Sequence, residues 1–273
     1  MSAGPDRASA TPGPVTVTAS TLDLAGTSIE VLDAAPRPDM AGAAPLVLLH
    51  EGLGSARLWR SFPWDVAAAT GRRTVAYSRP GYGSSSVVTA PRTPRYMHDE
   101  AIHVLPAVLR GLGIERPVLV GHSDGASIAL IHAGAAHPVT AVVAIAAHVL
   151  VEERSLEGIR AARHRFETTD LGARMGRHHR DPVATFRGWN DIWLSEEFRD
   201  WNIERSLPAI TAPVLVVQAA DDEYGTTDQV RRIAEGVAGP AQTLVLPGGG
   251  HAPHLTRSDE VCAAVTRFLA DLP

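Results

Sequence analysis

A short pattern of glycine and serine near the middle of the chain holds a candidate nucleophile. Gly121-His122-Ser123-Asp124-Gly125 follows the apolar run 118–120 and precedes a run rich in helix formers. A strand that turns abruptly into a helix around a serine exposes the hydroxyl, and flanking glycines avoid collisions in so tight a turn. The helix N-terminus also favours developing negative charge. We therefore predict that Ser123 is a nucleophile.

A serine hydroxyl reacts slowly unless a base takes its proton and an acid orients that base. His251 is the favoured base, because the glycines at 248–250 give a loop that can return an imidazole over a sheet. His254, three residues further on, is the competing base. Carboxylates follow the apolar run 214–218 directly, and the candidate acids are Asp221, Asp222 and Glu223.

Strand-like apolar runs alternate with helical patterns along most of the chain. This alternation predicts a parallel, doubly wound α/β sheet that can hold these residues at its edge. Residues 15–34 read as an antiparallel hairpin at one side of the sheet. Runs of strand length occur at 45–50, 73–77, 118–122, 140–147, 213–218 and 241–246, and helices are expected at 58–70 and 97–112.

The strand–Gly-x-Ser-x-Gly–helix pattern and the chain order Ser123, Asp222, His251 resemble the α/β-hydrolase family. The resemblance implies a doubly wound, mostly parallel eight-stranded sheet, with helices on both faces and a helical cap inserted after strand six. Residues 17–148 and 209–273 would form the core, residues 149–208 the cap, and residues 1–16 a disordered N-terminal tail.

The same resemblance distinguishes the candidate residues. His251 lies where the family has its catalytic histidine, between the last strand and the last helix. Asp222 matches the acid of the family's Gly-x-x-Asp pattern, counted from Ala219. Asp221 and Glu223 are then expected to be solvated or to cap the next helix.

An oxyanion hole is expected between the nucleophile and the turn after residue 50. The family pattern His-Gly-x reads His50-Glu51-Gly52-Leu53 here. Gly52 is the expected backbone donor, with Leu53 as second choice, and the backbone N–H of Asp124 is the other donor.

Two acids near this oxyanion hole, Glu51 and Asp124, depart from the family pattern. Asp124 is expected to point to solvent or to an arginine, or to form one network with Glu51 and Arg79.

The cap is expected to supply an apolar pocket for the substrate. His122 is expected to pack beneath the serine turn, and residues 177–180 to form a solvated face rather than a metal site. Six arginines between residues 160 and 180 form either a surface face or an anion site. The residues expected to bind substrate are Glu51, Tyr82, His148, Trp189 and Trp193.

Composition limits the remaining possibilities. The net charge of −5 gives no reason to expect nucleic acid, and the single cysteine, Cys262, excludes an internal disulfide. No apolar run reaches the length of a membrane span, and residues 1–16 lack a secretory pattern. We expect a cytoplasmic protein without cofactor or metal, whose partner is a small ester-like molecule. The sequence leaves monomer and homodimer open.

These residues predict a serine hydrolase that cleaves a small or medium carboxylic ester through an acyl-enzyme. Thioester, lactone and carbon–carbon bond hydrolysis remain alternatives on the same residues. A lyase, a cyclase or a ligand receptor that retains the triad is the alternative outside hydrolysis.

Overall fold

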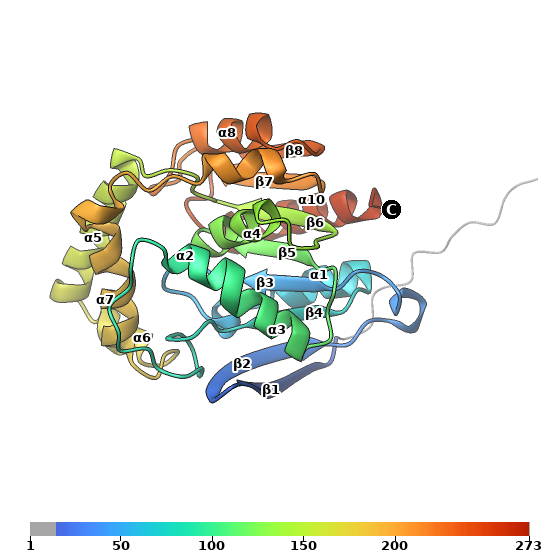
Figure 1. Ribbon diagram of the computed structural model, residues 1–273, viewed down its shortest axis with the longest axis horizontal. Helices are drawn as coiled ribbons and strands as arrows, with labels where there is room; N and C mark the ends of the chain where they lie inside the picture. Colours follow the sequence, from blue (N-terminus) through green and yellow to red (C-terminus); the bar gives the residue numbers. More distant parts are fainter. Residues whose placement is uncertain (1–14, 273) are drawn as a thin grey trace, which may run out of the picture.

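The computed structural model describes residues 15–272 and contains one eight-stranded sheet (Figure 1). The strand order is β1-β2-β4-β3-β5-β6-β7-β8. Strands β1 and β2 form the antiparallel edge, and the pairs from β4 to β8 are parallel. The predicted α/β sheet is therefore confirmed. The strands are β1 (Val17–Leu24), β2 (Thr27–Ala34), β3 (Leu46–Leu49), β4 (Thr74–Tyr77), β5 (Val118–His122), β6 (Ala141–Ile145), β7 (Val214–Ala219) and β8 (Ala241–Leu246).

Helices cover both faces of the sheet, as predicted (Figure 1). Strands β3 to β7 are buried along their whole length because each face packs on an apolar helix surface. One face carries α1 (Phe62–Thr70) and α10 (Ser258–Ala270). The other carries α3 (Leu105–Gly111), α4 (Asp124–Gly134) and α8 (Asp228–Gly236).

The segment between β6 and β7 contains helices but no strand, apart from one isolated bridge between Leu150 and Asn202. Its helices lie at the left of Figure 1, beyond the ends of the central parallel strands. They are α5 (Glu153–Thr168), α6 (Leu171–Met175) and α7 (Pro182–Trp193), followed by short 3₁₀ helices at Glu196–Phe198 and Glu204–Ala209. The cap boundaries at 149 and 208 remain predictions. The predicted tail lies outside the described residues except for its last two.

Two predicted helices are interrupted. The expected helix from residue 58 to residue 70 is a 3₁₀ helix, Ala56–Trp59, followed by α1, because Arg60 adopts a positive φ of 55° between them. The expected helix from 97 to 112 is built from α2 (Tyr96–Asp99), a π-helical turn at Glu100–Val104 and α3. Two further short helical elements are a 3₁₀ helix at Pro38–Met40 and α9 (Pro253–Thr256).

Across residues 15–272, no helix is both long and apolar enough to cross a bilayer.

Candidate active site

Ser123 sits in a strained turn between β5 and α4. Its φ of 53° lies in the left-handed region, which non-glycine residues rarely adopt. Both flanking glycines are required by close packing. A Cβ at Gly121 would lie 2.4 Å from the backbone of Ala126, and one at Gly125 would lie 2.0 Å from the carbonyl oxygen of Leu49. The sequence pattern therefore produces the sharp turn that brings the serine to the sheet edge.

Three side chains from three strand ends form one hydrogen-bonded chain. His251 Nε2 lies 2.8 Å from Ser123 Oγ, and His251 Nδ1 lies 2.9 Å from both carboxylate oxygens of Asp222. Asp222 is fully buried after β7, and it also accepts hydrogen bonds from Tyr224 N and Gln218 Nε2. The structure thus brings together the three residues that the sequence singled out.

The charges around His251 suit its role as a base. Burial alone would lower the pKa of His251, but the hydrogen bond and negative charge of Asp222 outweigh burial and raise it above the ordinary value. Burial would likewise raise the pKa of Asp222, yet its bonds to His251 and the Tyr224 backbone lower it. Asp222 is therefore an anion that stabilises a proton on the imidazole.

The competing candidates have other contacts. His254 is buried against the rings of Trp59 and Phe62, and it does not bond to Ser123. Asp221 Oδ1 accepts from Gly250 N at 2.8 Å, and Glu223 Oε2 accepts from His251 N at 3.1 Å. Both acids are exposed, so the expectation that they are solvated is confirmed, and each also holds the backbone of the histidine loop.

Three donors fix the peptide that precedes Gly52. The carbonyl oxygen of Glu51 accepts from His50 Nδ1 at 2.8 Å, from Arg79 Nη2 at 2.9 Å and from Gly54 N at 3.1 Å. A trans peptide is planar, so the N–H of Gly52 points away from this carbonyl and from the buried Arg79 guanidinium. Gly52 and Leu53 both line the cavity that contains Ser123. Because Gly52 lines the cavity, we expect its N–H to face the cavity side.

Asp124, the residue after the serine, is fully buried rather than turned to solvent. Its Oδ2 accepts from the hydroxyl of Tyr96 at 2.6 Å, and that hydroxyl accepts from Trp193 Nε1 at 2.9 Å. The expected bond to an arginine does not form. A hydrogen-bond chain instead connects the serine turn, through the core helix α2, to cap helix α7. The Tyr96 hydroxyl therefore holds the Asp124 side chain in the core, beside the backbone N–H that is the expected oxyanion donor.

The Glu51 carboxylate is separate from Asp124, so the expected shared network is wrong. Glu51 Oε2 lies 3.4 Å from His122 Nδ1, and His122 Nε2 donates to the carbonyl oxygen of His251 at 2.7 Å. Burial would raise the pKa of Glu51, but the bond to His122 and its charge hold that pKa well below the usual range. His122 is buried, as expected, and ties the Glu51 loop to the histidine loop.

A cavity of about 90 Å³ opens beside Ser123 and His251. Of the predicted substrate-binding residues, Glu51, His148, Trp189 and Trp193 line it. Tyr82 does not: its ring is buried beneath the guanidinium groups of Arg79 and Arg92, at 4.6 and 4.8 Å. The remaining lining residues, which the sequence analysis missed, are Ser155, Ile159 and Tyr224. Of these, Tyr224 could have been found, because it lies only two positions after Asp222.

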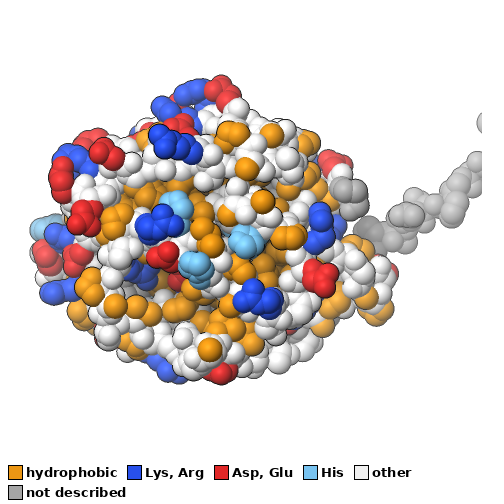
Figure 2. Space-filling view, viewed as in Figure 1, with side chains coloured by type: hydrophobic (Ala, Val, Ile, Leu, Met, Phe, Trp, Pro, Cys, Tyr) orange, Lys and Arg blue, Asp and Glu red, His pale blue; other side chains and the backbone are white. Residues whose placement is uncertain are grey.

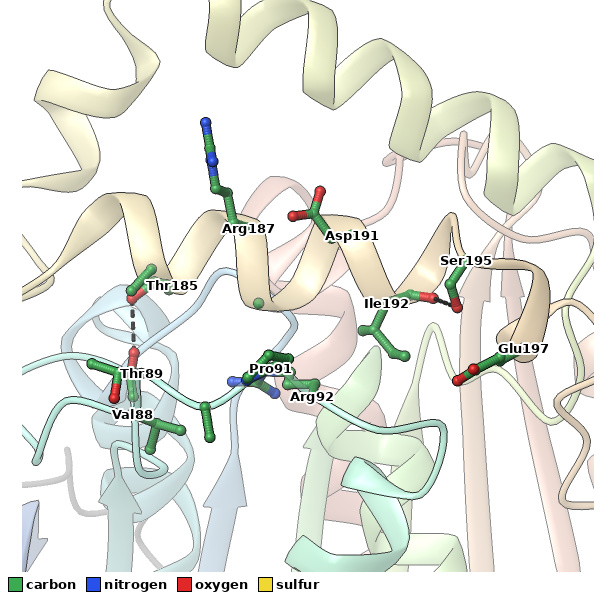
Figure 3. Close-up of a pocket in the computed structure, with 14 residues that line it drawn as sticks. Val88, Thr89, Pro91, Arg92, Thr185, Arg187, Asp191, Ile192, Ser195 and Glu197 are labelled. Atoms are coloured by element: carbon green, nitrogen blue, oxygen red, sulfur yellow. Dashed lines mark hydrogen bonds between the residues drawn. The ribbon is translucent and has the colours of Figure 1, made fainter.

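A larger groove of about 500 Å³ lies on a neighbouring face of α7 and contains none of the candidate catalytic residues. It separates α7 from the loop around Val88–Arg92, as Figure 3 shows. Thr185 Oγ1 donates to Gly81 O at 2.7 Å and anchors the helix to the core at one end of this groove. We place the candidate site at the smaller cavity, because only there do a nucleophile and a base meet.

Part of the charged surface of the cap is paired internally. Three of the six arginines expected as a face or anion site bond to acids, namely Arg160 to Glu153, Arg163 to Asp191 and Arg174 to Asp170. Red and blue side chains accordingly lie close together at the left of Figure 2. The predicted solvated face at 177–180 is wrong for His179. This side chain is buried, accepts from Gly83 N and donates to Leu53 O.

The sequence model of the alpha/beta hydrolase family matches residues 46–264. The chain belongs to this family. It is 28% identical over 249 residues to a Caulobacter sp. (strain K31) protein named "Putative carbamate hydrolase RutD", covering 82% of this chain and 90% of that protein. The proline iminopeptidase of Lactobacillus helveticus (strain DPC 4571) is 24% identical over 266 residues, covering 82% of this chain and 89% of the relative.

Solved structures share the fold. The enol-lactonase from Burkholderia xenovorans LB400 superposes with a TM-score of 0.70 at 20% identity, covering 92% of this chain and 100% of that one. The proline iminopeptidase of Mycobacterium smegmatis has a TM-score of 0.68 at 24% identity, covering 93% of this chain and 98% of that one. These relatives are named for different bonds, so the comparisons support a hydrolase without fixing its substrate.

The hydrogen-bond chain from Asp124 to the cap makes a stability prediction. Tyr96→Phe leaves the buried Asp124 oxygen without its donor and the Trp193 N–H without its acceptor, and we expect a loss of about 2–3 kcal/mol. Tyr82→Phe is the matched control, because the Tyr82 hydroxyl is buried with no partner in the described chain. It should cost less than about 1 kcal/mol. Urea unfolding measures both, and equal losses would contradict the proposed tether.

Proposed function

We propose that this protein is a serine hydrolase that cleaves a small carboxylic ester through an acyl-enzyme. Ser123 is the proposed nucleophile, His251 the base and Asp222 the orienting acid. The backbone N–H groups of Gly52 and Asp124 are the proposed oxyanion donors, with Leu53 as second choice. The observation that carries this proposal is the unbroken chain from Asp222 through His251 to Ser123, with contacts of 2.9 and 2.8 Å.

The reaction follows from these contacts. His251 Nε2 takes the proton as Ser123 Oγ attacks the acyl carbon, and Asp222 stabilises the imidazolium through Nδ1–H. The carbonyl oxygen becomes an oxyanion that the backbone donors stabilise. When the tetrahedral species collapses, the imidazolium gives its proton to the departing alkoxide. Water then attacks the acyl-enzyme with His251 as base, releasing the acid and restoring the serine.

The choice of a small substrate rests on the size of the cavity beside Ser123, and the relatives' names indicate which other bonds must be tested. The cavity beside Ser123 measures about 90 Å³, against about 500 Å³ for the groove along α7, and this small size favours a short acyl group. The relatives' names include a carbamate hydrolase, a proline iminopeptidase and an enol-lactonase. Amides, carbamates, lactones and thioesters are therefore the alternatives to test beside esters.

An active-site probe tests the nucleophile. A fluorophosphonate should label the wild type once per chain at Ser123, and Ser123→Ala should neither be labelled nor hydrolyse short nitrophenyl esters above background. Ser127, whose hydroxyl is buried and bonds to His148 O at 2.6 Å, provides the control: Ser127→Ala should keep full labelling. Intact-mass spectrometry and a rate assay measure both. Turnover that survives in Ser123→Ala would disprove the assignment.

The pH dependence of kcat/KM should reflect the pKa of the base, His251. His251 acts only when neutral, so kcat/KM should fall as the pH drops through its pKa, which Asp222 raises above the ordinary value of about 6.5. Asp222→Asn removes the charge that raises this pKa and leaves the burial that lowers it. The acid limb should therefore move to lower pH while the rate falls by about 10⁴. A pH–rate profile of both proteins measures this, and an unmoved limb would count against His251 as base.

A further inference from the structure

The candidate catalytic cavity contains an indole N–H that no protein group uses. Trp189 projects from α7 and lines this cavity together with Ser123 and His251. Its side chain is 7% exposed, and no residue from 15 to 272 accepts a hydrogen bond from its Nε1. The unpartnered indole nitrogens of Trp59 and Trp201 are sealed inside the protein. The indole nitrogen of Trp189 is not buried in this way, and the catalytic cavity that Trp189 lines is the space to which we assign its N–H.

Gly52 allows this indole to approach the reaction centre. A Cβ atom at Gly52 would lie 2.2 Å from Nε1 and 2.3 Å from Cδ1 of Trp189, which leaves no room for any side chain. The nitrogen-bearing edge of the indole therefore packs on the Cα of the residue proposed as an oxyanion donor. A substrate whose carbonyl oxygen meets Gly52 must place its next few atoms against this edge.

The other walls disfavour a negatively charged acyl group. Glu51 adds a carboxylate, and no arginine occurs among the lining residues in the described part of the chain. Burial, and then the neighbouring His251, lower the pKa of His148 to about 4, so its imidazole is neutral at pH 7. Ile159, Trp193 and Tyr224 supply apolar surface. The cavity is thus small, mostly apolar and without a cation that could hold a carboxylate.

We propose, on the basis of the ester hydrolase proposed above, that the Trp189 indole N–H selects the substrate. The selected class is short acyl groups that lack a negative charge and carry a hydrogen-bond acceptor, such as an ether or carbonyl oxygen, two or three atoms from the scissile carbonyl. An all-carbon acyl group of the same size displaces water from this N–H and leaves it unpaired, which costs free energy. An acyl group that carries an acceptor also displaces this water, but its acceptor then takes a direct hydrogen bond from the Trp189 N–H.

A pair of substrates of equal size tests this selection. In 4-nitrophenyl methoxyacetate an ether oxygen replaces one methylene of 4-nitrophenyl butyrate. Because the two esters differ in intrinsic reactivity, the measured quantity is the ratio of their kcat/KM values in each variant. Trp189→Phe keeps an aromatic ring and removes the N–H. We expect the methoxyacetate-to-butyrate ratio to fall about three- to tenfold in this variant, the effect of one neutral hydrogen bond.

Trp201→Phe is the matched control, because it removes an unpartnered indole N–H that is buried in the cap outside the cavity. Its ratio should equal that of the wild type. An unchanged ratio in Trp189→Phe, including an equal loss of both rates, would overturn the proposal. If the wild type hydrolyses neither ester, the proposed function fails instead. Calorimetric binding of both intact esters to the wild type and to Trp189→Phe then decides the selection, and an equal loss of affinity for the two esters would overturn it.

Discussion

The site depends on the fixed position of one imidazole, that of His251, between Asp222 and Ser123. The three residues belong to loops that follow β8, β7 and β5, and parallel strands bring such carboxyl ends to one edge of the sheet. The backbone of the histidine loop is held in turn by Asp221, by Glu223 and by the ring of His122. This bonding fixes which nitrogen faces the serine, and the pKa of the base follows from the same contacts.

The opposite side of the cavity is organised by a buried polar cluster. Arg79 holds the carbonyl oxygen of Glu51, which orients the Gly52 peptide, and Tyr96 holds the side chain of Asp124. Both proposed oxyanion donors are therefore fixed from behind by side chains that never reach the cavity. The second of these contacts continues to Trp193 of the cap. The Tyr96 hydroxyl therefore links the position of the cap to the geometry of the turn that holds Ser123.

The sequence predicted the sheet, the helical segment and the three residues that meet at the strand ends, because each depends on local pattern and chain order. It could not predict contacts that depend on how distant loops pack. Asp124 looked like a solvated first-turn acid, yet the cap and α2 bury it. His179 looked solvated because its neighbours are charged, while its own ring bridges Gly83 and Leu53. Tyr82 looked like a pocket residue but packs under two arginines.

A crystal structure of the protein after reaction with a phosphonate ester would show which residue is the nucleophile and which groups hold the oxyanion, because such an adduct mimics the tetrahedral species. We expect phosphorus bonded to Ser123 Oγ, with the phosphoryl oxygen accepting from the backbone N–H groups of Gly52 and Asp124. His251 would remain bonded to Asp222. Phosphorus on another residue, or a phosphoryl oxygen turned away from both N–H groups, would contradict the account.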